Sequence, residues 1–494
     1  MERKFKVIIF LTIVIFAILY SCGSDNENAN TNDNINNHAN SGENIYDPGS
    51  AAEPEIPDNL PVKDFGGYNF RIYLEDVSQA ALTYDCLYIE ELNGDILNDA
   101  IYNRNKAVED RFNITISPVI YTEWGIPGER PILAGEDAFD IISSHGIIAY
   151  RYAGRNLVVD WAANMPYVDL TKPWWNQDVV DEFSFFGKLN AATGDISYST
   201  LAYTVCVFFN KKLFQELNLE YPYEDVINGA WTLDKFMSVV RNGAADLNGD
   251  GVLSAEADRF GFNIYNRWSF PITVLYSGGD RIIKKDGDGL PVLTLYNERT
   301  KNIYDKLFDM LDTGTAIVGG IGKWGNPDNI DTFRSGRALF GDRIMDGFVI
   351  YREMEDEIGI VPIPKYNEST PKYYSLMEAG VRMITVPVTV NDFERTSVIV
   401  EALAAGGYKT VTDVYYEMAL KTKYARDDES AAMLDFIRNG MVADFGYLND
   451  ALTLDLNLVG TKLVEASAPN FTSFYERYEQ RVLTNIERFI EESR

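Results

Sequence analysis

Histidine and cysteine are scarce in this chain, whose 494 residues contain two histidines and three cysteines. With only His38 and His145 available, the sequence holds neither a histidine cluster with zinc-ligand spacing nor a Ser-His-Asp set. The G-x-S-x-G motif of serine hydrolases is also absent. These absences exclude the common zinc enzymes and serine hydrolases.

Basic residues are also in short supply. The chain has 44 Lys and Arg residues against 74 Asp and Glu residues, and its formal net charge is −30. Nucleic acids and anionic membrane surfaces bind proteins through clusters of Lys and Arg. The charge balance therefore argues against both kinds of partner, and it favours a soluble protein with an acidic surface.

A long apolar run lies at the N-terminus, where residues 7–20 follow a short segment with Lys and Arg. At about 14 residues this run is shorter than a membrane span, and its layout is that of an export signal. The run ends in Ser21-Cys22, and residues 1–22 resemble a bacterial lipoprotein signal in which Cys22 is acylated. Tyr20 departs from the small or branched residue that is usual at its position. The alternative is an uncleaved signal anchor, and either case predicts a chain tethered outside the cytoplasmic membrane.

Residues 23–59 are rich in Asn, Ser, Gly and Asp and poor in aromatic and branched apolar residues. Such a segment buries too little surface to offset the loss of chain entropy, so the sequence predicts a disordered tether. The remaining stretch of about 435 residues is longer than one ordinary domain and predicts at least two lobes. Within it, Cys206 lies in an apolar run and should pack as a small hydrophobe. A Cys86–Cys206 disulfide could form in an oxidising compartment, but the spacing gives it no support.

Strands and helices alternate through the first part of the folded region. Residues 69–74, 114–119 and 138–143 have strand patterns, and residues 93–113 have helical spacing between the first two. This order predicts an open α/β sheet. Ligands bind such sheets beyond the carboxyl ends of the strands, where Ser144 and His145 lie. Both are candidate ligand-binding residues, and the alternative for His145 is a residue that caps a loop.

A second series of elements follows from about residue 196. Residues 202–209 are predicted as a buried strand, 231–245 as an amphipathic helix and 282–295 as a hairpin. Further strands are predicted at residues 358–364 and 381–388, and helices from residue 392 to the end. Several segments in this order resemble one protein family, and they are residues 208–214, 231–235, 333–340, 359–365 and 423–430.

The chain resembles the extracellular solute-binding proteins of ABC importers, in the sugar-type family 1 that includes maltose-binding protein. The resemblance implies a periplasmic-binding-protein-like type II fold, with two α/β lobes, a hinge and an interlobe ligand cleft. Lobe one would comprise residues 60–196 and 341–392, and lobe two residues 197–340 and 393–494. The first crossing would fall near residues 194–201 and the return near residues 340–346.

The resemblance also implies a function and its partners. Such a protein binds a carbohydrate, here an oligosaccharide, without changing it and delivers it to the membrane subunits of an ABC permease. The expected state is a monomer that is lipid-anchored on the extracellular face of the cytoplasmic membrane. An exported glycosidase or lyase is the main alternative, because paired carboxylates leave little trace in a sequence. A calcium-dependent surface adhesin is a third.

Residues 261–270 resemble the cleft loop of maltose-binding protein, in which an aromatic ring stacks on a sugar. Trp268 falls at that aromatic position, Asn266 at a polar sugar contact, and Arg267 lies between them. The alternative for Trp268 is a core tryptophan. Asp342 and Arg343 lie at the predicted return crossing and either reach the ligand or form a structural ion pair. Trp124 lies in a loop that could cover the cleft, whereas Trp174 and Trp175 are predicted to pack in the interior.

A second candidate site is a predicted Ca²⁺ loop of the EF-hand type. Oxygen ligands would come from the side chains of Asp246, Asn248 and Asp250 and from the carbonyl of Val252. Gly251 stands at the sharp turn, and Asp258 would close the shell because Ala257 occupies the usual acidic position. The role of the ion would be structural. The alternative is an Asx-rich turn that binds no metal.

Overall fold

The computed structural model describes residues 56–75, 87–320, 322, 324–326, 328, 330–351, 353–416 and 428–493. Cys22, Cys86, most of the predicted tether and residues 423–427 of the family-like segments lie outside the described residues. The chain divides into the units Met1–Ile56 and Pro57–Arg494, and everything below concerns the second unit. No helix among its described residues is long and apolar enough to cross a membrane.

The first sheet of this unit has four strands in the order β13-β3-β1-β2. Strand β1 pairs in parallel with β2 and β3, and β13 runs antiparallel to β3. The strands are β1 (Tyr68–Glu75), β2 (Ile114–Tyr121), β3 (Ile141–His145) and β13 (Arg382–Thr385). The helices that follow these strands in sequence are α1 (Ile96–Phe112), α2 (Glu129–Leu133), α3 (Gly146–Ala153), α4 (Trp161–Asn164) and α5 (Gln177–Phe183). We call this sheet with its helices lobe one.

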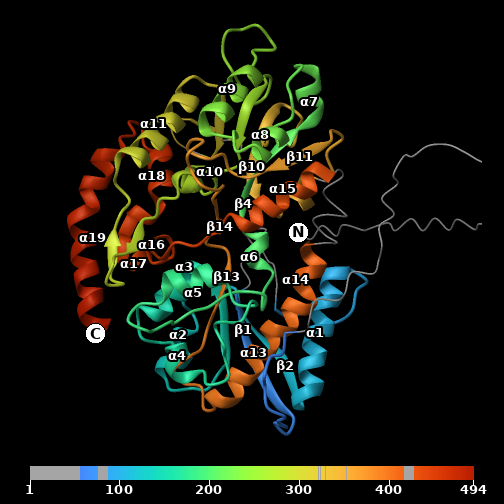
Figure 1. Cartoon of the computed structure of the whole chain (residues 1–494), viewed down its shortest axis with the longest axis vertical. Helices are drawn as coiled ribbons and strands as arrows, with labels where there is room; N and C mark the ends of the chain where they lie inside the picture. Colours follow the sequence, from blue (N-terminus) through green and yellow to red (C-terminus); the bar gives the residue numbers. More distant parts are fainter. Residues whose placement is uncertain are drawn as a thin grey trace, which may run out of the picture. The chain divides into compact units, whose positions relative to one another are not determined.

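The second sheet has six strands in the order β11-β4-β10-β5-β8-β9. They are β4 (Val205–Asn210), β5 (Phe260–Ile264), β8 (Ala316–Gly319), β9 (Gly325–Asn326), β10 (Ala338–Ile344) and β11 (Ile358–Val361). Its helices include α7 (Lys211–Glu216), α8 (Tyr223–Ile227), α9 (Leu233–Gly243), α10 (Phe270–Thr273), η2 (Val274–Gly278), α11 (Glu298–Asp312), α12 (Gly347–Tyr351) and α15 (Asp428–Asn439). This is lobe two (Figure 1). Helix α6 (Ser199–Ala202) lies in the segment that connects the two lobes (Figure 1). The predicted hairpin is confirmed by β6 (Ile283–Lys285) and β7 (Pro291–Leu293).

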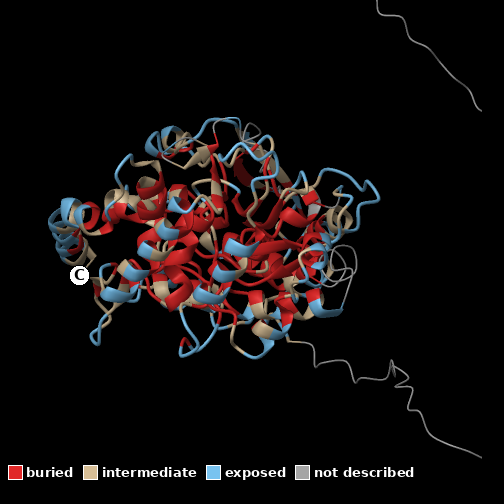
Figure 2. Ribbon diagram, turned by 90° about the horizontal axis from the view of Figure 1, so that it is seen from above, coloured by how far each residue is buried: buried red, intermediate tan, exposed pale blue. Residues whose placement is uncertain are grey.

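Local sequence explains where several of these helices begin. Asp95 precedes α1 and its carboxylate accepts the N–H groups of Leu97 and Asn98 at 3.0 and 3.2 Å. Asn297 and Thr300 form a reciprocal capping box at the start of α11. Buried residues lie along the strands and on the helix faces that pack against them, and the exposed residues lie on the outer faces of the helices (Figure 2).

The predicted division between the lobes is wrong at residue 341. Strand β10 continues to Ile344 and pairs with β4, and β11 extends the same sheet antiparallel to β4. Residues 341–361 therefore belong to lobe two, and the chain returns to lobe one only between β11 and β13. The return lies later than predicted because these two strands complete the second sheet.

The predicted division is also wrong at residue 393. Helix α13 (Phe393–Lys409) packs on α1 in lobe one, together with α14 (Val411–Asp413). Glu401 of α13 accepts the indole N–H groups of Trp174 and Trp175 at 3.0 and 2.9 Å. Both tryptophans are buried, which confirms their predicted packing role. Cys206 is also buried, as predicted, and it is a free cysteine.

The C-terminal elements lie beside both lobes. They are β14 (Met441–Val442), which pairs with β12 (Ser375–Leu376), and then α16 (Phe445–Leu448), α17 (Asp450–Thr453), η4 (Leu454–Leu458), α18 (Val459–Glu465) and α19 (Phe471–Ser493). Helices α16 and α17 contact α3 of lobe one. Helix α18 packs on α10 of lobe two, and α19 runs along one side of the unit (Figure 1).

Candidate functional site

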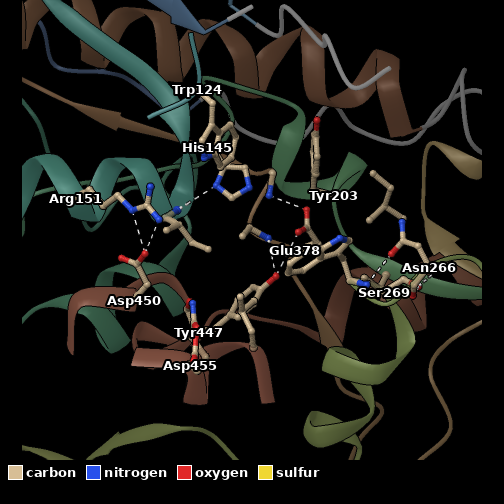
Figure 3. Close-up of a pocket in the computed structure, with 18 of the residues that line it drawn as sticks. Trp124, His145, Arg151, Tyr203, Asn266, Ser269, Glu378, Tyr447, Asp450 and Asp455 are labelled. Atoms are coloured by element: carbon tan, nitrogen blue, oxygen red, sulfur yellow. Dashed lines mark hydrogen bonds and ion pairs between the residues drawn. The ribbon is translucent and has the colours of Figure 1, made fainter. Parts of the chain in front are cut away.

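A cleft of about 840 Å³ is lined by residues from both lobes and from the C-terminal helices. Lobe one supplies the end of β3 and the start of α3, and lobe two supplies the loop after β5 and the end of β10. The aromatic members of the wall are Trp124, Tyr203, Tyr265, Trp268, Tyr447 and Tyr478. The charged members are Arg151, Arg343, Glu378, Arg382, Asp450, Asp455 and Arg481 (Figure 3).

The loop after β5 carries Trp268 and Asn266 into this cleft. Trp268 is 40% exposed, so it is not the core tryptophan of the alternative interpretation. The side-chain oxygen of Asn266 accepts the backbone N–H of Trp268 at 2.7 Å, and Ser269 Oγ donates to the Asn266 carbonyl at 2.8 Å. These local bonds hold the loop in one conformation and leave the indole face open to the cleft.

Arg267 does not line the cleft. Its Nε lies 2.6 Å from Glu465 Oε1, and its guanidinium lies 4.9 Å from the centre of the Trp268 ring. Thr461 Oγ1 donates to the Arg267 carbonyl at 2.8 Å. Arg267 therefore packs over the Trp268 ring and attaches the loop to α18, a role different from the ligand contact that the sequence suggested.

Asp342 lies behind the wall of the cleft and is fully buried. Its carboxylate accepts the N–H groups of Tyr265 and Phe270, both at 2.7 Å, and so holds the two ends of the Trp268 loop. Burial raises the pKa of Asp342 to about 6, against the opposing effect of these hydrogen bonds. The prediction that Asp342 reaches the ligand is corrected, because the side chain is aimed at the loop backbone.

Arg343, the next residue along β10, does line the cleft. Its guanidinium lies 3.9 Å from the centre of the Tyr265 ring, and its Nε lies 3.1 Å from Asp346 Oδ1. The alternative of an ion pair between Asp342 and Arg343 is therefore wrong, because Arg343 pairs with Asp346 and Asp342 accepts backbone N–H groups. Arg343 presents a fixed cation and a stacked ring to the cleft.

His145 combines the two roles that the sequence left open. Its Nδ1 accepts the N–H of Ile147 at 3.3 Å and caps α3, while the imidazole also forms part of the cleft wall. Burial lowers the pKa of His145 to about 3, so the ring is neutral. Trp124 lies in the same wall, with ring centres 5.0 Å from His145 in an edge-to-face arrangement. Ser144 is fully buried and is not on the wall.

A buried ion pair stands behind His145. Arg382 Nη1 lies 3.2 Å from Glu75 Oε2, and the same oxygen accepts the backbone N–H of His145 at 2.9 Å. Arg382 also reaches the cleft wall. This pair connects the end of β1 to β13 across β3 and positions the residue that caps α3.

Sequence reasoning missed the polar residues that the later part of the chain contributes. Arg151 of α3 donates to Asp450 Oδ2 of α17 at 3.0 and 2.7 Å, and Tyr478 of α19 donates to Asp455 Oδ2 at 2.6 Å. Glu378 also lines the cleft. No local motif distinguishes these positions, since each reaches the cleft only through the packing of distant segments.

The predicted calcium loop lies apart from the cleft wall. Asp246 Oδ1 accepts the N–H of Gly249 at 2.7 Å and its Oδ2 that of Gly251 at 2.8 Å, while Asp258 accepts the N–H groups of Leu247 and Ser254. Within the described part of the chain, no group of three or more His, Cys, Asp or Glu side chains is arranged to hold a metal ion. These are the bonds of an Asx-rich turn, and calcium binding through Asp246, Asn248, Asp250, Val252 and Asp258 stays a prediction.

Comparison with known proteins reveals similarity at the level of the fold. No family model matches the chain, and no curated protein matches its sequence. UgpB from Mycobacterium tuberculosis, solved in complex with glycerophosphocholine, is 14% identical and superposes with a TM-score of 0.55 over 86% of this chain and 99% of that one. The cyclic α-maltosyl-1,6-maltose binding protein from Arthrobacter globiformis is 14% identical, with a TM-score of 0.53 over 86% and 100% of the two chains.

A third similar structure is the maltose/maltodextrin-binding domain MalE from Bdellovibrio bacteriovorus, bound to maltotriose. It is 13% identical and superposes with a TM-score of 0.51 over 86% of this chain and 100% of that one. At such low identity these likenesses concern the fold alone. They confirm the predicted periplasmic-binding-protein-like type II fold, because the matches extend over nearly the whole of each neighbour.

Proposed function

We propose that this protein is the substrate-binding component of an ABC importer and that it binds a carbohydrate in the cleft between its two lobes. The observation that carries the proposal is the composition of the cleft wall. It combines Trp268 and several tyrosines with arginine, amide and carboxylate groups. The fold adds support, since the similar solved proteins include binders of maltotriose and of cyclic α-maltosyl-1,6-maltose.

The chemistry of the wall matches that of a sugar. Sugar rings have apolar C–H faces that pack on aromatic rings, and their hydroxyls bond to planar polar side chains. The indole of Trp268 offers such a face, and Asn266, Arg343 and Glu378 lie on the same wall. The cleft of about 840 Å³ has the size of sites that hold a ligand of several rings.

Binding would act by favouring a closed arrangement of the lobes, which the permease then recognises. The ligand would leave unchanged, so the protein would not be an enzyme. In this proposal the protein is a monomer on the extracellular face of the membrane, attached through an acylated Cys22. Replacing Cys22→Ala should move the protein from the membrane fraction to the medium, and unchanged membrane association would contradict the lipid anchor.

A thermal-shift screen of the purified protein against oligosaccharides tests the main proposal. A ligand at 100 times its Kd should stabilise the folded state by about 2.7 kcal/mol. Chromatography of the recovered sugar distinguishes a binding protein, which returns it intact, from a glycosidase or lyase. Stabilisation by no glycan, together with a hit among other solutes such as glycerophosphodiesters, would overturn the carbohydrate assignment.

Trp268→Ala provides the site-specific test. Loss of the stacking surface should weaken sugar binding about tenfold, since each aromatic stacking contact contributes about 0.5–1.5 kcal/mol beyond the apolar area it buries. Leu133→Ala is the control, because Leu133 is 69% exposed and does not line the cleft. Calorimetric titration of both variants should show the loss for the first alone, and equal affinities would place the ligand elsewhere.

A further inference from the structure

Glu378 is a cleft residue whose carboxylate has no ion-pair partner among the described residues. It lies in the segment between β11 and β13, and its side chain lies between the labelled Tyr203 and Tyr447 (Figure 3). Its Oε2 accepts the N–H of Gly380 at 2.7 Å, and Tyr447 OH donates to its Oε1 at 3.3 Å. Both donors are neutral, so neither compensates the charge of the carboxylate.

The arginines of the same wall do not neutralise it. Three of them already have a carboxylate partner of their own. The pairs are Arg151 with Asp450, Arg382 with Glu75, and Arg343 with Asp346, at 2.7, 3.2 and 3.1 Å. Among the described residues no cation lies within ion-pair distance of Glu378. Burial raises the pKa of Glu378, and no neighbouring cation opposes this rise.

The backbone beside Glu378 is built around this arrangement. A Cβ at position 380 would lie 2.0 Å from the Tyr203 ring and 2.9 Å from Glu378 Oε2, so only glycine fits there. Because residue 380 is glycine, its N–H can donate to the Glu378 carboxylate while the ring of Tyr203 packs against its Cα. The Glu378 backbone N–H donates to the Tyr203 carbonyl at 2.8 Å, which ties the two residues together.

We propose that Glu378, Tyr203 and Tyr447 form a subsite for a positively charged nitrogen, so that the carbohydrate bound in the cleft carries an amino group. The inference rests on the proposed function and specifies its substrate class as amino sugars. An ammonium would satisfy the carboxylate by a charge-assisted hydrogen bond and be attracted to the faces of the tyrosine rings.

We prefer an ammonium over a hydroxyl because of the free energy that it costs to cover the charge of Glu378 with a ligand. A ligand that closes over Glu378 removes water from a carboxylate, and this loss is expensive unless an opposite charge replaces the water. A hydroxyl donates one neutral hydrogen bond, whereas an ammonium supplies both the bond and the charge.

Matched pairs of oligosaccharides test this inference at pH 7. Each pair consists of a glucose oligomer and the glucosamine oligomer of the same length and linkage, in α-1,4 and β-1,4 series, so that an ammonium replaces one hydroxyl per ring. Calorimetric titration should give at least tenfold tighter binding for the amino member of a pair. Glu378→Gln should remove this preference and leave the binding of the neutral member within about threefold of its original value.

Glu378→Gln suits the test because its side-chain carbonyl can still accept the Gly380 N–H, and far-ultraviolet circular dichroism would verify the fold. Asp309→Asn is the control, since it removes a carboxylate that pairs with Arg241 away from the cleft and should not change the preference. Equal binding of both members, or an amino preference that survives in Glu378→Gln, would overturn the inference and leave carbohydrate binding intact. Failure of every member of the panel would also overturn the amino-sugar inference, whereas carbohydrate binding is overturned only by the broader screen described above.

Discussion

Replacing Asp342 by asparagine should weaken ligand binding while hardly changing stability. In the native protein the carboxylate accepts N–H groups from Tyr265 and Phe270 at 2.7 Å. Asparagine has the same shape, but its NH₂ group would face one of these donors. Leaving a buried N–H without an acceptor costs about 1–3 kcal/mol.

The loss is offset because the native carboxylate is itself unfavourable at neutral pH. Burial raises the pKa of Asp342 from 3.8 to about 6, and a difference of about two in pKa corresponds to about 3 kcal/mol. Since the folded pKa lies above the unfolded one, this group stabilises the fold most below pH 4, and that stability is lost as the pH rises through 6. Removing the charge at pH 7.5 therefore cancels most of the cost of the lost hydrogen bond.

Ligand binding has no such compensation, because the Trp268 loop loses one of its two attachments to Asp342. We expect faster hydrogen exchange of the amides of residues 265–270. A Kd about two to ten times higher should follow from a loss of about 0.5–1.5 kcal/mol of aromatic stacking. Hydrogen exchange by mass spectrometry and calorimetric titration measure these effects.

Asp258→Asn, studied in EDTA, is the matched control for this experiment. Asp258 is also a buried carboxylate that accepts two backbone N–H groups, but it lies away from the cleft. This variant should lose stability and keep its Kd. An Asp342→Asn protein with native exchange in residues 265–270 and a native Kd would refute the positioning argument.

Three further predictions concern stability. Burial raises the pKa of Glu401 to about 7, so its contribution to stability is fully present below pH 4.5 and is lost as the pH rises through 7. Urea unfolding at several pH values should show that Glu401→Gln removes this part of the pH dependence. Identical pH profiles for the native protein and the variant would contradict this prediction. Asp450→Asn should lower the free energy of unfolding by less than about 1 kcal/mol, because the Arg151–Asp450 pair is partly exposed. A much larger decrease in the free energy of unfolding, measured by the same assay, would mean that the pair is buried in solution. Millimolar calcium should raise the Tm relative to EDTA, and Asp246→Asn should abolish the difference; equal Tm values would leave the Asx-rich turn as the correct interpretation.

The sequence predicts individual site residues where the signal is local. Trp268 is flanked by Asn266, Arg267 and Ser269, and polar neighbours of this kind are typical of a loop. His145 follows a buried strand, and the carboxyl end of such a strand is where ligands bind in α/β sheets. The structure places both side chains on the cleft wall.

Adjacent candidates could not all be correct, because neighbouring residues in an extended chain point to opposite sides. In strand β10, Arg343 faces the cleft and Asp342 faces the backbone of the Trp268 loop. At the end of β3, His145 reaches the wall and Ser144 is buried beneath it. Side chains alternate between the two faces of a strand, so in each pair of neighbours one residue is expected to face the ligand and the other the protein interior. The alternation does not say which residue of the pair faces the ligand.

The C-terminal wall of the cleft could not be predicted, because it depends on how one helix meets both lobes. Helix α19 places Tyr478 and Arg481 on the wall. Near its start Tyr475 stacks on Tyr296 of lobe two at 4.8 Å between ring centres, and near its end Phe489 packs edge-on against Phe185 at 5.7 Å.

These contacts connect the wall to the proposed motion of the lobes. Phe185 follows α5 in lobe one, and Lys188 Nζ donates to the Ser493 carbonyl at 2.8 Å beside it. A hinge motion that separates the lobes must either break these contacts or carry the end of α19 with lobe one. One edge-to-face aromatic pair contributes only about 0.5–1.5 kcal/mol beyond the area it buries. This energy is small enough for the lobes to separate when no ligand is bound, so α19 can close one side of the cleft without preventing it from opening.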